Sequence, residues 1–197
     1  MYVYSTYLFL CGRRGANGML PIHMACLSGY ADCVENLITP EMNLISETDN
    51  DKRTCLHAAA CGGNLDCLEL MIGQGCDINA RDKHGRTPLH YATSTAQFQC
   101  ILSLVANGAA VNVFDNKGCT PLHFASAADA DANCVTHLLR NGSKTGQLDS
   151  QGYSPLHYAA AKGHKLVIQQ LMDRLPDDIT TNNFDTPQTT PLHLAVS

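Results

Sequence analysis

The sequence predicts an all-α fold in which one helix–turn–helix unit recurs along the chain. The first observation is the tetrapeptide Thr-Pro-Leu-His or a close variant, whose histidine recurs every 33 to 36 residues. The second is that turn aspartates and helical cysteines keep nearly the same spacing. The histidines are His23, His57, His90, His123, His157 and His193, the aspartates Asp49, Asp82, Asp115 and Asp149, and the cysteines Cys33, Cys67, Cys100 and Cys134. Six copies in register predict a single stack of repeats.

The unit that begins at Asp82 is the most regular and serves as the reference. Thr87 is expected to cap a helix that begins at Pro88, because threonine offers a side-chain acceptor and proline has no amide that needs one. Residues 82–85 have the polar-then-glycine pattern of a tight turn. A second helix is expected over residues 98–106, and Gly108 is expected to end it.

The repeats are expected at about 15–48, 49–81, 82–114, 115–148 and 149–184, with a truncated sixth at 185–197. We predict one domain over residues 15–197, preceded by an atypical segment, 1–14. The first repeat lacks the capping threonine and turn aspartate, and its second helix is expected to stop at Pro40. The polar stretch 176–189 is expected to be a long loop.

Three repeats have unusual turns. Lys52 occupies the position of the turn glycine in the second repeat, and Ala96 that of the glycine between the helices of the third. The fourth repeat has a longer turn at Asp129-Ala-Asp131, which explains its 34-residue length. These are local changes, because the signature after each turn is retained.

The period near 33 residues and the Thr-Pro-Leu-His signature resemble ankyrin repeats. The resemblance implies a solenoid of helix–turn–helix units with β-turn or hairpin fingers. It also implies a concave protein-binding face, formed by the finger tips and the exposed end of each first helix. The candidate residues on this face are Lys83, His84, Arg86, Ser94, Thr95, Phe98, Asn116, Lys117, Cys119, Ser150, Gln151, Tyr153 and Lys162. Arg86 and Tyr153 are the expected anchors, since these residue types combine large contact area with hydrogen bonding.

Composition excludes several functions. The 13 Lys and Arg against 18 Asp and Glu leave a net charge of −5, and the sequence has no basic stripe that would bind nucleic acid. The periodic cysteines are expected to pack in the core, which favours a reducing compartment, the cytosol or nucleus. The apolar residues 1–11 precede their positive charges and are too short to span a bilayer, so we expect a truncated repeat or an alternative start.

The signature histidines are expected to be structural, each neutral imidazole bridging backbone groups within and between repeats. The most metal-like grouping is Cys55, His57, Cys61 and Cys67, but it has no Cys-x-x-Cys pair, so we expect no zinc. No nucleotide-binding loop, nucleophile elbow or kinase signature is present. The sequence therefore favours a protein without catalytic activity or cofactor.

Three stretches resemble the middle repeats of the serine/threonine protein phosphatase 6 regulatory ankyrin-repeat subunits. These are residues 53–67, residues 118–141 and Gln151-Gly-Tyr153. The resemblance implies a non-catalytic scaffold for a phosphatase catalytic subunit and its substrates. Two alternatives stay open, a generic ankyrin adaptor for another protein, such as a channel tail or transcription regulator, and the ankyrin segment of a longer enzyme.

Overall fold

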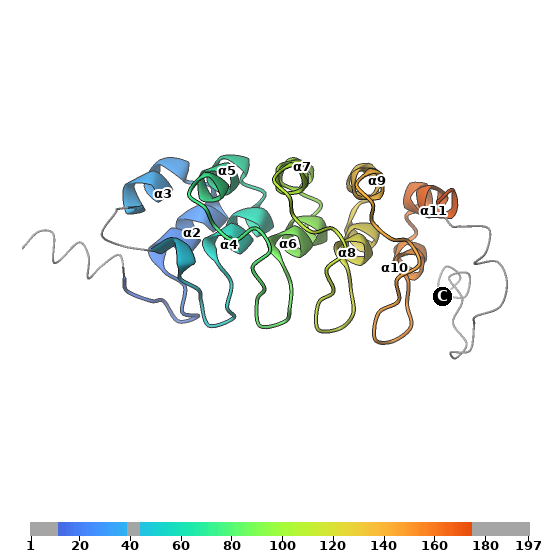
Figure 1. Ribbon diagram of the computed structural model, residues 1–197, viewed down its shortest axis with the longest axis horizontal. Helices are drawn as coiled ribbons and strands as arrows, with labels where there is room; N and C mark the ends of the chain where they lie inside the picture. Colours follow the sequence, from blue (N-terminus) through green and yellow to red (C-terminus); the bar gives the residue numbers. More distant parts are fainter. Residues whose placement is uncertain (1–11, 39–43, 175–197) are drawn as a thin grey trace, which may run out of the picture. The chain divides into compact units, whose positions relative to one another are not determined.

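The computed structural model describes residues 12–38 and 44–174 (Figure 1). The expected helix stop at Pro40, the long loop at 176–189, the sixth repeat with His193 and nearly all of the atypical segment 1–14 lie outside these residues. The described part contains ten α-helices and one short 3-10 helix, and no strand is found in it, which confirms the all-α class. No described helix has the length and apolar character needed to cross a bilayer.

The chain divides into two compact units, and the division falls inside the third repeat. The first contains residues up to Ala92 and Gln99–Ala109; the second contains Thr93–Phe98 and residues from Ala110 onward. The single domain expected from the periodicity therefore stays a prediction. The first unit holds α2 (Pro21–Ser28), α3 (Ala31–Leu37), η1 (Leu44–Ser46), α4 (Cys55–Gly62), α5 (Leu65–Gly73) and most of α6 (Pro88–Ser94) and α7 (Phe98–Ala106). The second holds α8 (Pro121–Ala128), α9 (Asn133–Arg140), α10 (Pro155–Lys162) and α11 (Lys165–Met172).

Within each unit the first helices of successive repeats pack together, and the second helices form another row. In the first unit α2 packs on α4 and α3 on α5; in the second α8 packs on α10 and α9 on α11. Figure 1 shows these two rows and the finger loops that extend away from them. Fully buried side chains lie along both rows, among them Ile22, Leu56, Leu68 and Met71 in the first unit and Leu122, Leu138 and Leu171 in the second.

The helix boundaries of the reference repeat agree with the prediction. Helix α6 begins at Pro88, directly after Thr87, and α7 spans Phe98–Ala106. Gly108 has a φ of +89°, a left-handed conformation that suits glycine at the end of a helix. The predicted start of α6 and the predicted end of α7 are therefore confirmed.

One of the four periodic cysteines does not occupy the predicted core position. Cys67, Cys100 and Cys134 are buried, but Cys33 is exposed at the equivalent position of α3. Helix α3 packs on α5, and its buried residue is Val34, the neighbour of Cys33. The prediction was wrong for Cys33 because α3 turns the adjacent valine, and not the cysteine, into the packed interior.

Candidate protein-binding surface

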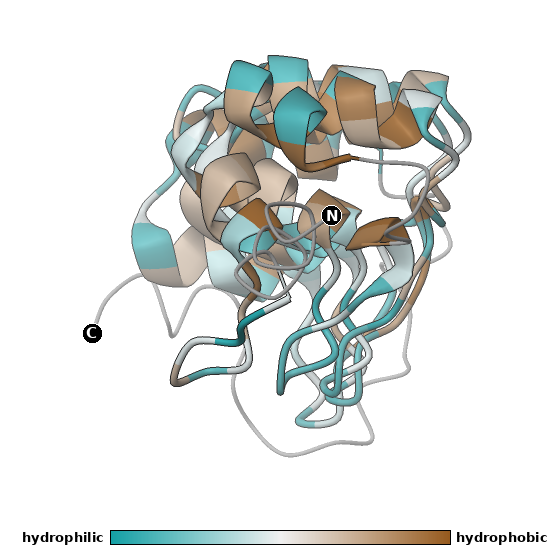
Figure 2. Ribbon diagram, turned by 90° about the vertical axis from the view of Figure 1, so that its left-hand side faces the viewer, coloured by the Kyte–Doolittle hydropathy of each residue, from teal (hydrophilic) through white to brown (hydrophobic). Residues whose placement is uncertain are grey.

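The fingers of the second to fifth repeats each close around a turn aspartate. One carboxylate oxygen of Asp82 accepts the amides of His84 and Arg86, both at 2.8 Å. Asp149 accepts the amides of Gln151 and Tyr153 in the same way, both at 2.9 Å. These bonds fix the backbone of the tip, whose side chains are mainly polar, as the hydrophilic colours of the finger ends in Figure 2 show.

The second carboxylate oxygen ties two of these fingers to a helix. Tyr91 of α6 donates its hydroxyl to Asp82, and Tyr158 of α10 donates to Asp149, both at 2.8 Å. Burial first, and then the bond to Asp82, raise the pKa of Tyr91 to about 12. Burial alone would raise the pKa of Asp149, but the bonds from Tyr153 and Tyr158 lower it below its ordinary value. These two fingers are therefore held at the base as well as at the tip.

Adjacent fingers are also joined within each unit. In the first unit the amide of Lys83 donates to the carbonyl of Asp51 at 2.8 Å, and the Lys83 ammonium forms an ion pair with the Asp51 carboxylate. In the second unit the amide of Ser150 donates to the carbonyl of Lys117 at 2.8 Å. A binding partner thus meets fingers whose spacing within a unit is already fixed.

The signature histidines make the bridges predicted from their two ring nitrogens. Nδ1 of His57 accepts the amide of Thr54 at 3.1 Å, and Nε2 lies 3.1 Å from the carbonyl oxygen of Arg86 in the next finger. Because a carbonyl only accepts hydrogen bonds, Nε2 carries the proton and Nδ1 the lone pair. The same bridge to the next finger is made by His23 to Arg53 and by His123 to Tyr153, each at 3.2 Å.

Burial keeps these imidazoles neutral. Desolvation lowers the pKa of His23, His57 and His123 below the ordinary value of 6.5, against the opposing effect of the carbonyl acceptors. Both ring nitrogens of His57 are engaged, so neither has a lone pair for a metal ion. Within residues 12–38 and 44–174, no group of three or more potential ligands could hold a metal.

The first unit carries three of the predicted binding residues on one finger. Lys83 and His84 are exposed at its tip, and Lys83 is already paired with Asp51. Arg86 is half-buried, its amide bound to Asp82 and its carbonyl to His57. At this position the backbone is therefore structural, and only the side chain can differ between repeats.

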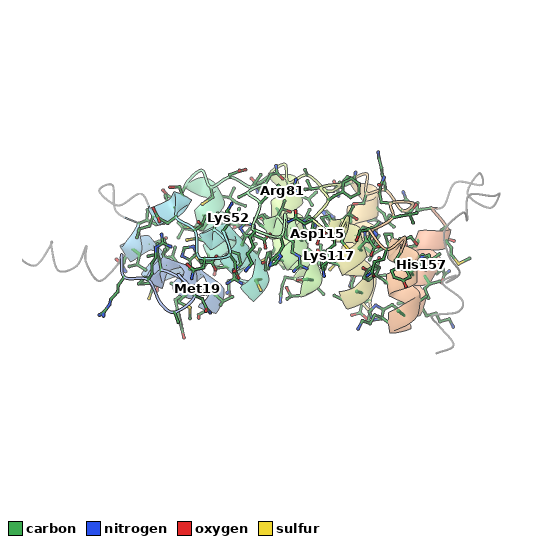
Figure 3. The ribbon with its side chains drawn as sticks, turned by 90° about the horizontal axis from the view of Figure 1, so that it is seen from below. Met19, Lys52, Arg81, Asp115, Lys117 and His157 are labelled. Carbon is green, nitrogen blue, oxygen red and sulfur yellow. The ribbon has the colours of Figure 1, made fainter. Side chains whose placement is uncertain are left out.

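The second unit carries the others. Phe98 is half-buried against the edge of His137, with ring centroids 6.2 Å apart, and the Tyr153 ring lies 5.6 Å from that of His157. Figure 3 labels Lys117 on its finger. The exposed members of the predicted set in this unit are Ser94, Thr95, Asn116, Lys117, Ser150, Gln151 and Lys162. The structure thus gives most of the predicted residues the exposure that binding requires.

Cys119 was wrongly expected to line the surface. Its side chain is buried, with Sγ 3.9 Å from a carboxylate oxygen of Asp149 and 3.6 Å from the hydroxyl of Tyr158. The small thiol fits between its own finger and the next one, where it lies beside the Tyr158–Asp149 hydrogen bond. The larger Tyr153 at the equivalent position stays partly exposed.

Two exposed apolar residues were missed from the sequence. Phe114 exposes 42% of its surface and Leu148 exposes 51%. Each directly precedes the turn aspartate of its finger, and both fingers belong to the second unit. The sequence already distinguishes these two positions, because the equivalent residues in the first unit, Thr48 and Arg81, are polar.

Comparison with known proteins agrees with this architecture. A family model described as ankyrin repeats (3 copies) matches residues 6–82, 62–132 and 126–197. Subunit AVO2 of target of rapamycin complex 2 from Saccharomyces cerevisiae is 36% identical over 74 residues, which cover 36% of this chain and 17% of that protein. Human NF-kappa-B inhibitor alpha is 32% identical over 74 residues, 35% of this chain and 23% of the inhibitor.

The RelA-associated inhibitor of Mus musculus is 32% identical over 72 residues, which cover 36% of this chain and 9% of that protein. The chain therefore spans less than a quarter of each of these relatives. The family match covers nearly the whole chain, and the helices, fingers and bridging histidines have the periodicity of that repeat. The chain belongs to the ankyrin-repeat family.

Proposed function

We propose that this chain is a non-catalytic scaffold that binds other proteins through its fingers and first helices. One observation carries the proposal: the periodic polar residues hold the repeats together, while the residues that differ between repeats are exposed at the finger tips. Ankyrin repeats indicate protein partners in general. A preformed surface suits this role, because little ordering entropy is lost on binding.

The chemistry of the core supports a role without catalysis. Nucleophilic cysteines need a low thiol pKa, but burial raises the pKa of Cys67 and Cys100 to about 11, so these thiols stay protonated near neutral pH. His57 and His123 have lowered pKa values and donate to backbone carbonyls of the next finger. These groups are better suited to packing than to reaction.

For the partner, we propose the catalytic subunit of protein phosphatase 6 or its substrates. The support is the resemblance of residues 53–67, 118–141 and 151–153 to the regulatory ankyrin-repeat subunits of that phosphatase. The second candidate is an adaptor or inhibitor of a different protein. It is favoured by the names of two relatives, NF-kappa-B inhibitor alpha and RelA-associated inhibitor. A third candidate, the ankyrin segment of a longer enzyme, would be decided by the full coding sequence.

Affinity purification of the full chain from cell lysate, followed by mass spectrometry, tests these candidates. The variant Arg86→Glu with Tyr153→Ala alters two side chains and keeps the backbone groups that accept the histidine bonds. Arg140→Glu, which reverses an exposed charge on α9, is the control. Phosphatase 6 components that enrich with wild type and control but not with the finger variant would support the scaffold. Unrelated proteins that enrich with wild type and control but not with the finger variant would favour the adaptor. Proteins that bind the finger variant as well as the wild type would contradict the proposed surface.

For location we propose the cytosol or nucleus. The nine described cysteines are free thiols, and most are buried in the packed interior. Reduced thiols persist in compartments that keep glutathione and thioredoxin active. Imaging of the tagged full chain would test this proposal, and accumulation in the secretory pathway would contradict it.

A further inference from the structure

The second unit carries an apolar patch on two neighbouring fingers. Phe114 and Leu148 are 42% and 51% exposed, and each occupies the position immediately before a turn aspartate. Isolated exposed apolar side chains are common and need no explanation. Here two large ones recur at one position in consecutive repeats, so they lie at matching places on adjacent fingers.

Hydrogen bonds between the two fingers fix this patch from both ends. On one side Asn112 donates its side-chain amide to the carbonyl of Gly142 at 2.9 Å and accepts the amide of Lys144 at 3.0 Å. On the other side the amide of Ser150 donates to the carbonyl of Lys117 at 2.8 Å. Phe114 lies between Asn112 and Lys117 in the chain, so its backbone is held close to the neighbouring finger on each side.

The exposed charged side chains on these two fingers are lysines. In residues 110–120 and 141–154 the charged residues are Lys117, Lys144, Asp115 and Asp149. Both lysines are exposed, whereas Asp115 is buried and Asp149 is half-buried. Each carboxylate accepts two amides of its own finger, so the lysines are the charged groups most accessible to a partner.

We propose that the finger edge formed by Phe114, Leu148, Lys117 and Lys144 binds a segment of a partner protein that presents apolar side chains beside acidic ones. The inference rests on the proposed protein-binding function and adds the chemistry of the partner. Burying exposed apolar side chains such as Phe114 and Leu148 against a partner removes apolar surface from water, which favours binding. The lysines select carboxylates and raise the association rate. A ligand surface with charge alone, such as the phosphate backbone of a DNA duplex, would leave Phe114 and Leu148 without a role.

Selection from a library of short random peptides displayed on phage tests the proposal. The full-length chain is immobilised beside the double variant Phe114→Ser with Leu148→Ser, the single variants Leu148→Ser and Lys117→Glu, and the control Leu166→Ser. The control removes an equally exposed leucine, 53% exposed, from α11. Circular dichroism confirms that each variant is folded, and Leu148→Ser keeps the test valid if the double variant unfolds.

Wild type and control are expected to enrich peptides that combine leucine or phenylalanine with a net negative charge. The double variant should bind the selected peptides about tenfold more weakly, equivalent to about 1.4 kcal/mol. Lys117→Glu should weaken the binding of the selected peptides severalfold at low salt and less at high salt, because ions screen exposed charges. A short DNA duplex, measured in the same way, should bind much more weakly than the peptides.

Three results would overturn the inference: no enrichment, enrichment of peptides with another composition, or binding that the variants leave unchanged. Tighter binding of the duplex, lost with Lys117→Glu, would assign the lysines to phosphate groups instead. The lysate purification with Arg86→Glu and Tyr153→Ala is scored separately. If proteins are captured there while the peptide selection fails, the scaffold function stands and only this partner chemistry is wrong.

Discussion

Replacing Lys52 with glycine should stabilise the chain. Lys52 has a φ of +59°, whereas the equivalent residues of the other four described fingers are glycines with φ between +73° and +83°. A residue with a side chain pays about 1–2 kcal/mol in this left-handed region. Glycine loses about 0.5–1 kcal/mol more conformational entropy on folding. The difference predicts that Lys52→Gly raises the free energy of unfolding by about 0.5–1 kcal/mol.

Urea unfolding followed by circular dichroism measures this difference, which corresponds to roughly 1–4 °C in Tm for a chain of this size. Lys52→Ala removes the same side chain but keeps the Cβ, so it should give no comparable gain. In the opposite direction, Gly118→Ala should destabilise, because a Cβ there would lie 3.1 Å from the Ser150 amide nitrogen at a φ of +78°. If Lys52→Gly and Lys52→Ala are equally stable, backbone strain is not the cause.

Three further predictions concern the polar network. His57→Ala should lower the free energy of unfolding by about 3–4 kcal/mol, because it leaves the Thr54 amide and the Arg86 carbonyl without their partner. The control His84→Ala, at a finger tip, should change the free energy of unfolding by less than about 0.5 kcal/mol. Equal urea midpoints for the two variants would contradict the bridging role. Asp129→Ala should lower the free energy of unfolding by about 1–2 kcal/mol, since Asp129 accepts the Val135 amide in the first turn of α9 at 3.1 Å. An unchanged urea midpoint would show that this bond contributes nothing. The folded state lowers the pKa of its buried signature histidines, so their contribution to stability is complete above about pH 7.5 and is lost as pH falls through 6.5. The urea midpoint should therefore drop between about pH 7.5 and pH 5.5. A midpoint that rises over this range would reverse the assigned direction.

The parts of the fold that depend on local chemistry were predictable. Thr87-Pro88 fixes the start of α6, and Gly108 follows the end of α7, because caps and turns act over a few residues. Burial was harder to predict. Cys33 is exposed because α3 turns the adjacent Val34 into the packed interior. Cys119 is buried because the surroundings of a side chain depend on neighbouring repeats, which a single-repeat pattern does not describe.

The candidate site was predictable to the same extent. Finger tips such as His84 and Gln151 are exposed, as expected for residues outside the signature. Phe114 and Leu148 escaped notice because an apolar residue before a turn is equally compatible with a core contact. Asp129 was assigned only to a longer turn, since its carboxylate meets an amide six residues onward, beyond the range of the usual capping motifs.

The histidine bridge bears on how such a chain can change over time. At each described joint, His23 to Arg53, His57 to Arg86 and His123 to Tyr153, one partner is a side chain and the other is a main-chain carbonyl. Every amino acid supplies that carbonyl, so this bond requires no matched pair of side chains in neighbouring repeats. Recombination that inserts, deletes or reorders whole repeats would keep the bond. The side chain of the residue that supplies the carbonyl can differ, as it does between Arg86 and Tyr153.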